Sequence, residues 1–91
     1  MSYKLLYLPG ANKDIKKLDA SIKPVIKKAL EKISDDLQIG KPLMYSFTGL
    51  FSYRVSSYRI IYEIQDKELL VLVVSVGHRR EVYEKLRKLL G

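Results

Sequence analysis

The sequence predicts an α+β fold in the order β-α-α-β-β-β-α, with a helix hairpin packed on an antiparallel sheet and a helix at the C-terminus. Two observations predict it. Apolar residues recur at helical spacing in the first half of the chain, and from residue 43 onwards the period changes to two. Short polar turns separate the period-two segments, which is typical of an antiparallel meander. A chain of 91 residues has room for one core, so residues 1–91 are predicted to form a single domain.

The first three elements precede the change of period. Residues 2–8 are rich in aromatic and aliphatic side chains and predict a strand that ends at a Pro-Gly pair. Residues 11–19 place three apolar side chains on one helical face. After a short break, Ser21 is expected to cap a second helix, whose apolar stripe runs from Ile22 to Leu37. The Gly-Lys-Pro sequence at 40–42 is expected to end that helix.

The second half predicts the meander and the last helix. Residues 43–47 fit either a short strand or an extended lead-in. The three predicted strands are 50–55, 58–64 and 68–76, and the predicted last helix is 79–90, with Val82, Leu86, Leu89 and Leu90 on one side. Two helices can cover one face of such a sheet. The last helix is expected to cover an edge or part of the other face, which leaves room there for a site.

The net charge and the amino-acid composition limit the kinds of partner and binding site expected for this protein. The net charge of +7 favours a polyanionic partner. All five arginines lie after residue 41, whereas nine of the twelve lysines lie in residues 1–41, so planar phosphate-binding groups concentrate in the second half. The absence of cysteine excludes disulfides and thiolate metal sites and suits a reducing cytoplasm. No signal-peptide pattern opens the chain, and its longest apolar run is far too short to cross a membrane.

Two arginines flank the predicted turn at Ser56-Ser57. With a two-residue turn, Arg54 lies opposite Arg59, and alternation puts both on the face away from the helix hairpin. Directly opposed like charges cost stability in a sheet. A carboxylate such as that of Glu63 could neutralise them, but Arg79 and Arg80 leave the neighbouring strand at the same end. The convergence favours an anion site of the phosphate-binding type.

Cleavage of RNA without a metal requires a base for the 2′-hydroxyl, cations for the phosphate and an acid for the leaving oxygen. The sequence offers no carboxylate cluster for Mg²⁺ and no paired histidines for zinc, so no metal and no cofactor are expected. His78 is the candidate base, and its alternative role is a hydrogen bond to the backbone. Tyr83 could stack on a nucleobase or donate to a phosphate, and its alternative role is packing under the last helix.

These residues resemble a known family. The stretch "YRVSSYRIIYEI", followed by "LLVLVVSVGHRREVY", is similar to the RelE/ParE superfamily of toxin–antitoxin toxins along essentially the whole chain. The resemblance implies a RelE-like fold and a ribosome-dependent endoribonuclease that cuts messenger RNA in the decoding site and is held inactive by an acidic, RelB-like antitoxin. The family positions match Arg54, Arg59, Arg79 and Tyr83, while His78 stands where some members have lysine.

The sequence also departs from that family in two respects. Its Gly-His-Arg-Arg-Glu-Val-Tyr ending is shorter than in the best-known nuclease, so either Arg79 or Arg80 can match the family's arginine. The best-known nuclease has a second basic residue two positions before the Arg54 equivalent, and Ser52 stands there in this chain. Two alternative functions therefore remain open at this point. One is a ParE-like inhibitor of gyrase without catalysis, and the other is a weakened toxin that acts as a corepressor with its antitoxin. The arginine and tyrosine set favours the RNA-cleaving branch.

Overall fold

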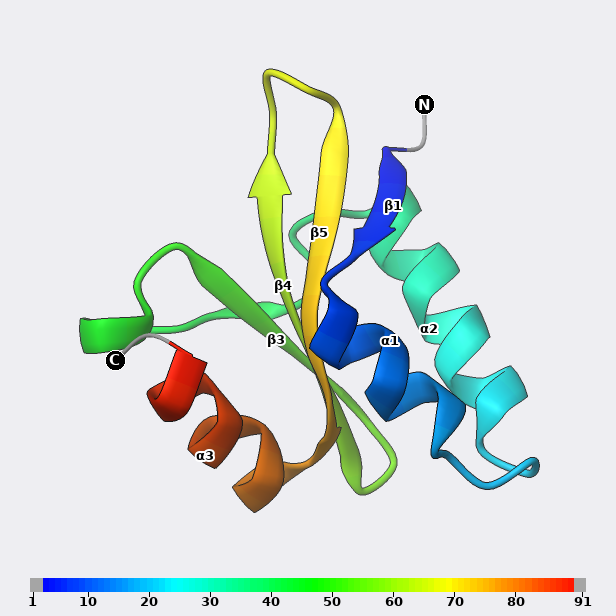
Figure 1. Cartoon of the computed structure of the whole chain (residues 1–91). Coiled ribbons are helices and arrows are strands. Elements are labelled where there is room, and N and C mark those ends of the chain that lie inside the picture. Colours follow the sequence, from blue (N-terminus) through cyan, green and yellow to red (C-terminus); the bar gives the residue numbers. More distant parts are fainter. Residues whose placement is uncertain (1–2, 90–91) are drawn as a thin grey trace.

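The computed structural model describes residues 3–89, which form three α-helices and a five-stranded sheet (Figure 1). The elements are β1 (Lys4–Tyr7), α1 (Pro9–Lys16), α2 (Lys23–Asp35), β2 (Lys41–Pro42), β3 (Leu50–Val55), β4 (Tyr58–Gln65), β5 (Leu70–His78) and α3 (Arg79–Leu89), with a short 3-10 helix at Tyr45–Phe47. The α+β class and the order of the predicted elements are confirmed. The short strand β2 is an addition to the predicted order.

The sheet is mixed rather than wholly antiparallel. Its strand order is β1-β5-β4-β3-β2, and the predicted meander of β3, β4 and β5 is antiparallel. However, β1 pairs in parallel with β5. The meander leaves the outer edge of β5 unpaired, and β1 pairs with that edge. Between β1 and the meander, the helix hairpin carries the chain across one face of the sheet. Such a crossover is what a parallel pair requires.

Both N-terminal helices begin away from the predicted positions. Helix α1 begins at Pro9, because proline already has a helical φ and lacks the N–H that a first turn leaves unpaired. The prediction that Ser21 caps α2 is wrong. Helix α2 begins at Lys23, the capping position is Ile22, and no side chain caps it. Instead the backbone carbonyl of Asp19 accepts from the N–H groups of Ile22 and Lys23.

The segment after α2 also differs from the prediction. Helix α2 ends at Asp35, so Leu37 lies beyond it. Residues 43–47 are not a strand; the pairing with β3 comes earlier, at Lys41–Pro42, and the later residues form the 3-10 helix. Leu90, which was predicted on the last helix, lies outside the described residues.

Helices α1 and α2 cover one face of the sheet, as predicted (Figure 1). Ile26 and Ile33 of α2 are buried against Ile60, Tyr62 and other residues of the central strands. The buried Tyr62 also carries polar contacts: its hydroxyl accepts from the Gly40 N–H at 3.0 Å and donates to the Leu37 carbonyl at 2.9 Å. These bonds hold the connection from α2 to β2 against the sheet.

Helix α3 covers part of the opposite face, as predicted (Figure 1). Its buried residues Val82 and Leu86 pack against Leu50, Ile61 and Val74. Val74 points to this face by alternation from Val73, which lies in the other core, and a bulge in the β4–β5 pairing leaves Val74 without a partner between Val73 and Ser75. Among residues 3–89, no helix is long and apolar enough to cross a membrane.

Candidate nucleic-acid interface

The two opposed arginines lie where the sequence predicts. Arg54 pairs with Arg59 and Val55 with Tyr58 across a two-residue turn. Ser56 takes a left-handed φ of 56°, which lets this turn reverse the chain within two residues. Both arginines therefore lie on the face that carries α3.

The two guanidinium groups extend in opposite directions along the sheet. Arg54 Nε donates to the carbonyl of Ser56, in the turn, at 3.3 Å. Arg59 Nη1 donates to the hydroxyl of Ser52 at 3.2 Å, two residues before Arg54 on β3. This divergence reduces the repulsion expected between directly opposed like charges. It also spreads positive charge over a longer stretch of the face.

A third arginine joins the pair. A hollow of about 220 Å³ is lined by Arg54, Ser57, Tyr58, Arg59 and Arg79. Arg79 reaches it because α3 begins directly after β5. Within residues 3–89, no ion pair joins any of these three arginines to a carboxylate. The alternative that Glu63 neutralises the pair is not seen, since its carboxylate accepts from the side chain of Gln65. The hollow is therefore lined by three arginines that have no carboxylate partner among residues 3–89, and its charge suits an anion such as phosphate.

His78 lies at the same end of the sheet but on the other face. It pairs with Tyr58, and the two rings stack with centroids 4.3 Å apart. Its Nδ1 lies 3.3 Å from the carbonyl of Ser57, as the alternative role anticipated. Because a carbonyl accepts only, this bond requires the hydrogen on Nδ1, which leaves Nε2 as the acceptor of a neutral ring. His78 does not line the hollow, although Ser57 does.

Tyr83 and Arg80 follow Arg79 on α3. Residues four apart lie on one side of a helix, so Tyr83 neighbours Arg79 along α3. The ring of Tyr83 is half-buried and stacks on Phe47, with centroids 6.1 Å apart. Neither Tyr83 nor Arg80 lines the hollow, and Arg80 is exposed. The structure thus brings Arg54, Arg59 and Arg79 together and places the other predicted residues around them.

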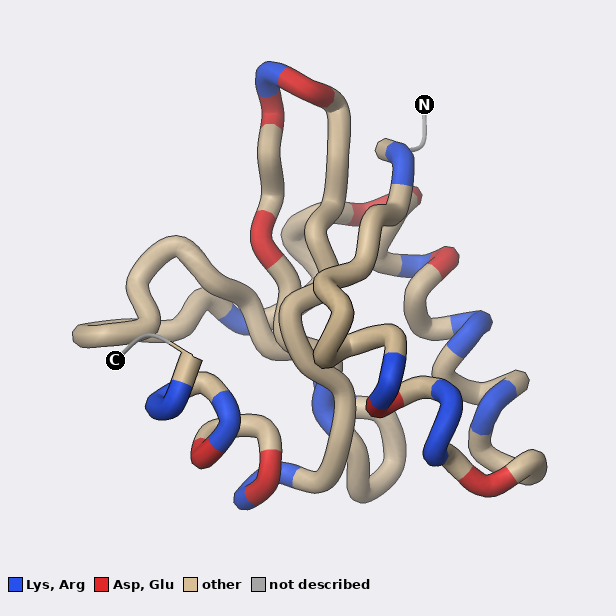
Figure 2. Tube along the Cα trace, in the orientation of Figure 1, with Lys and Arg blue, Asp and Glu red and all other residues tan. Residues whose placement is uncertain are grey.

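Charge is unevenly placed over the molecule. Two acidic residues flank Lys67 at the β4–β5 turn, and basic residues follow all three helices, where they outnumber the acidic ones (Figure 2). The β3–β4 turn, beside the arginine hollow, lies at the opposite end of the sheet from the β4–β5 turn (Figure 1). A polyanion is therefore attracted to the end that carries the hollow.

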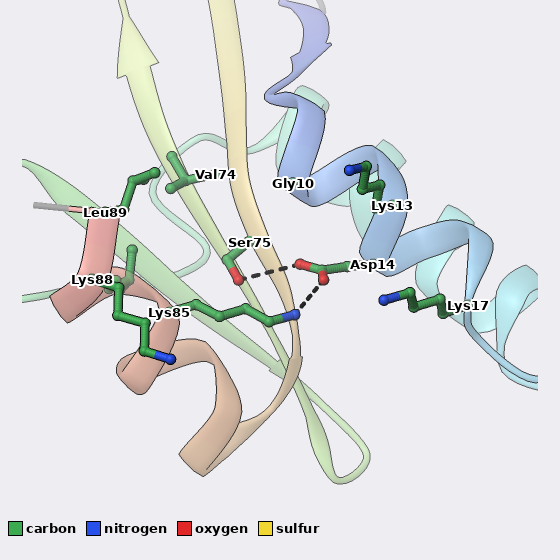
Figure 3. Close-up of a pocket in the computed structure, with 10 residues that line it drawn as sticks. Gly10, Lys13, Asp14, Lys17, Val74, Ser75, Lys85, Lys88 and Leu89 are labelled. Atoms are coloured by element: carbon green, nitrogen blue, oxygen red, sulfur yellow. Dashed lines mark hydrogen bonds and ion pairs between the residues drawn. The ribbon is translucent and has the colours of Figure 1, made fainter.

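A second depression lies between α1 and α3. This groove of about 420 Å³ has three apolar lining residues, the buried Val74 and Leu86 and the exposed Leu89. Its other lining residues, all labelled in Figure 3, are Gly10, Lys13, Asp14, Lys17, Ser75, Lys85 and Lys88. Its one carboxylate is already engaged. Asp14 pairs with Lys85 and accepts from the N–H of Val76 at 3.2 Å, at the edge of β5 that extends past β1. The groups of the groove that remain available to a ligand are therefore apolar side chains and lysines.

The sequence reasoning missed three residues that shape these surfaces. Ser52 is buried and holds Arg59, and Tyr58 lines the hollow. Asp14 links α1, β5 and α3. Alternation along β3 already put Ser52 on the arginine face, but only the observed direction of the Arg59 side chain reveals the contact. Among residues 3–89, no group of three or more histidine, aspartate or glutamate side chains could hold a metal ion.

Comparisons with known proteins agree with this architecture. The family described as ParE toxin of type II toxin–antitoxin system, parDE, matches residues 5–83. Toxin RelG of Mycobacterium tuberculosis is 33% identical over 87 residues, which cover 93% of this chain and 100% of RelG. The mRNA interferase toxin RelE of Escherichia coli is 31% identical over 96 aligned residues, with 97% of each chain covered. In the crystal structure of the M. tuberculosis toxin–antitoxin complex RelBE2, one chain superposes with a TM-score of 0.78 at 33% identity, covering 87% of this chain and 100% of that one.

Proposed function

This chain belongs to the ParE-type toxins of type II toxin–antitoxin systems, and we propose that it stops translation as a metal-independent, ribosome-dependent endoribonuclease that cuts messenger RNA. The observation that carries the proposal is the hollow lined by Arg54, Arg59 and Arg79, whose guanidinium groups have no carboxylate partner among residues 3–89. A similar E. coli protein is named an mRNA interferase. The proposed site of action is the cytoplasm, because messenger RNA meets the ribosome there.

The proposed reaction is attack by the 2′-hydroxyl of the RNA on the adjacent phosphate. A bond forms between the 2′ oxygen and phosphorus while the bond to the 5′ oxygen breaks, which leaves a 2′,3′-cyclic phosphate and a 5′-hydroxyl. As the phosphate becomes five-coordinate, its equatorial oxygens gain charge, and Arg54, Arg59 and Arg79 stabilise that charge. Arg80 extends the contact with the RNA backbone.

The proton transfers are assigned to the two remaining candidates. His78 takes the 2′ proton through Nε2, the ring nitrogen that its bond to Ser57 leaves free. Tyr83 lies one helical turn after Arg79, where its exposed part can stack on a nucleobase or donate to the leaving oxygen. The contact that supports this assignment is the hydrogen bond of His78 to Ser57, which lines the hollow, although the His78 ring lies on the other face of the sheet.

The test uses purified toxin with ribosomes that carry a defined messenger RNA. Primer extension maps the cut, and end analysis identifies the products. We expect a 2′,3′-cyclic phosphate, formed only when ribosomes are present. Ends bearing a 3′-hydroxyl and a 5′-phosphate would point to metal-activated water and contradict the proposed chemistry. Intact RNA together with cleaved gyrase–DNA complexes would favour the gyrase-inhibitor alternative instead.

The groove between α1 and α3 is the proposed docking surface for the antitoxin. An acidic amphipathic segment can bury its apolar side on Val74, Leu86 and Leu89 and pair its carboxylates with the lysines of the rim (Figure 3). The antitoxin then contacts the sheet and α3, and either covers the arginine hollow or displaces Tyr83. Hydrogen exchange of the free and bound toxin tests this. Protection confined to α2, with residues 70–89 unchanged, would contradict it.

A further inference from the structure

The positive face extends one strand further than the hollow. Lys41 lies on β2, the edge strand, directly opposite Ser52 of β3. Opposed residues of an antiparallel pair point to the same face, so Lys41 shares the face of Ser52, Arg54 and Arg59. Leu43 gives independent support: it is two residues further on and packs in the α3-side core with Leu50, and residues two apart in an extended segment point the same way.

This face therefore carries four cations, one from each of β2, β3 and β4 and one from the residue that follows β5. Arg79 follows β5 directly, Arg59 is on β4, Arg54 is on β3 and Lys41 is on β2. Adjacent strands are about 4.8 Å apart, so the backbone positions of these residues follow one another across the strands. The Arg59 guanidinium leans over β3 to Ser52, which is the direct neighbour of Lys41. This orientation closes the gap between the hollow and the edge strand.

The side chain of Lys41 is available to bind a ligand, and its backbone is held in place. Its side chain is exposed, and no ion pair joins it to an acidic side chain of residues 3–89. The backbone on either side is fixed. The N–H of Gly40 donates to the buried Tyr62 hydroxyl, and the Leu43 N–H donates to the Leu50 carbonyl at 2.8 Å. A charged group on a fixed backbone loses less freedom when it binds a ligand.

We propose that Lys41 is a phosphate ligand for single-stranded RNA and contacts the backbone beyond the phosphate held by Arg54, Arg59 and Arg79. This assignment rests on the proposed function, and it gives the direction in which the RNA lies. The strand crosses the sheet from the start of α3 toward β2, rather than following the strands.

The test measures RNA binding separately from cleavage. A fluorescent 2′-O-methyl RNA oligonucleotide cannot be cut, because it has no free 2′-hydroxyl, and its binding is followed by anisotropy over a range of salt concentrations. Each phosphate contact to single-stranded nucleic acid contributes about 0.7 to the slope of log K against log salt. We expect Lys41→Ala to reduce the slope by about that amount and Lys41→Arg to retain it. Lys67→Ala is the matched control, since it removes the same charge at the distant β4–β5 turn.

Cleavage by the same variants separates the two proposals. Lys41→Ala should cut ribosomal messenger RNA about tenfold more slowly than wild type, which corresponds to a weak charge-assisted hydrogen bond. A slope equal to that of wild type, an equal loss in Lys67→Ala, or no binding by wild type would overturn the Lys41 assignment. If wild type fails to cut RNA while Lys41→Ala still lowers the slope, the proposed reaction fails and the assignment of Lys41 stands.

Discussion

Replacing Arg59 with alanine should remove most of the cleavage and leave the fold intact. The variant takes away one of the three arginines that line the hollow. Loss of a single donor to a developing oxyanion typically costs about 2.7 to 4 kcal/mol in the transition state, or about 100- to 1,000-fold in rate. We expect the rate of messenger RNA cleavage to fall by that factor.

The free energy of unfolding should change far less. The variant loses the 3.2 Å hydrogen bond between Arg59 and Ser52, which contributes about 1 kcal/mol. It also removes a like charge opposite Arg54, and the loss of this repulsion stabilises the fold by about 0.2 to 1 kcal/mol. The two terms nearly cancel, so the net loss stays below about 1 kcal/mol. For a domain of this size, that corresponds to a fall in Tm of less than about 8 °C.

The assay combines single-turnover cleavage on programmed ribosomes with a thermal melt of each variant. Arg87→Ala is the matched control, because it removes an exposed arginine from the last turn of α3, away from the hollow. Should Arg59→Ala unfold, Arg59→Lys retains the charge without the planar fork and should still cut more slowly. A folded Arg59→Ala protein that cuts within threefold of the wild-type rate would refute the reasoning.

Three further predictions concern single side chains. His78→Phe keeps a ring to stack on Tyr58 but has no proton acceptor, so cleavage should fall about 100- to 10,000-fold; a wild-type rate would remove His78 from the mechanism. Tyr62→Phe leaves two backbone groups without their partner, so chemical denaturation should show a loss of about 1 to 3 kcal/mol, and an unchanged midpoint would contradict this. Asp14→Ala leaves the buried N–H of Val76 unpaired, with a similar expected loss; a melt identical to wild type would show that water replaces the carboxylate.

Burial should also make stability depend on alkaline pH. Desolvation is the main cause that raises the pKa of the Tyr62 hydroxyl above its usual value, and the nearby charge of Asp36 adds to it, while the Gly40 N–H acts in the opposite direction. The unfolded chain therefore loses this proton at lower pH than the folded protein. The contribution of Tyr62 is complete below its unfolded pKa and declines as the pH rises through the folded pKa. Tyr62→Phe should flatten this part of the curve of unfolding free energy against pH, and an unchanged curve would contradict the assignment.

The sequence alone determined the features that depend on local periodicity. Alternation along 50–55 and 58–64, with a turn centred on Ser56-Ser57, predicted both the pairing of Arg54 with Arg59 and the face on which they lie. The apolar spacing of the helices predicted which sides they bury. The RelE/ParE resemblance followed from the same short stretches, and the family match over residues 5–83 confirms it.

Only the tertiary structure decided how distant segments meet. The parallel pairing of β1 with β5 joins segments more than sixty residues apart, and no local pattern specifies it. The Ser52 contact depends on which rotamer of Arg59 the surrounding side chains favour. His78 lies on the far face, because its pairing with Tyr58 and the stack of their rings decide its direction. Lys41 was expected only to end a helix, and its place among the cations depends on the pairing of an edge strand two residues long.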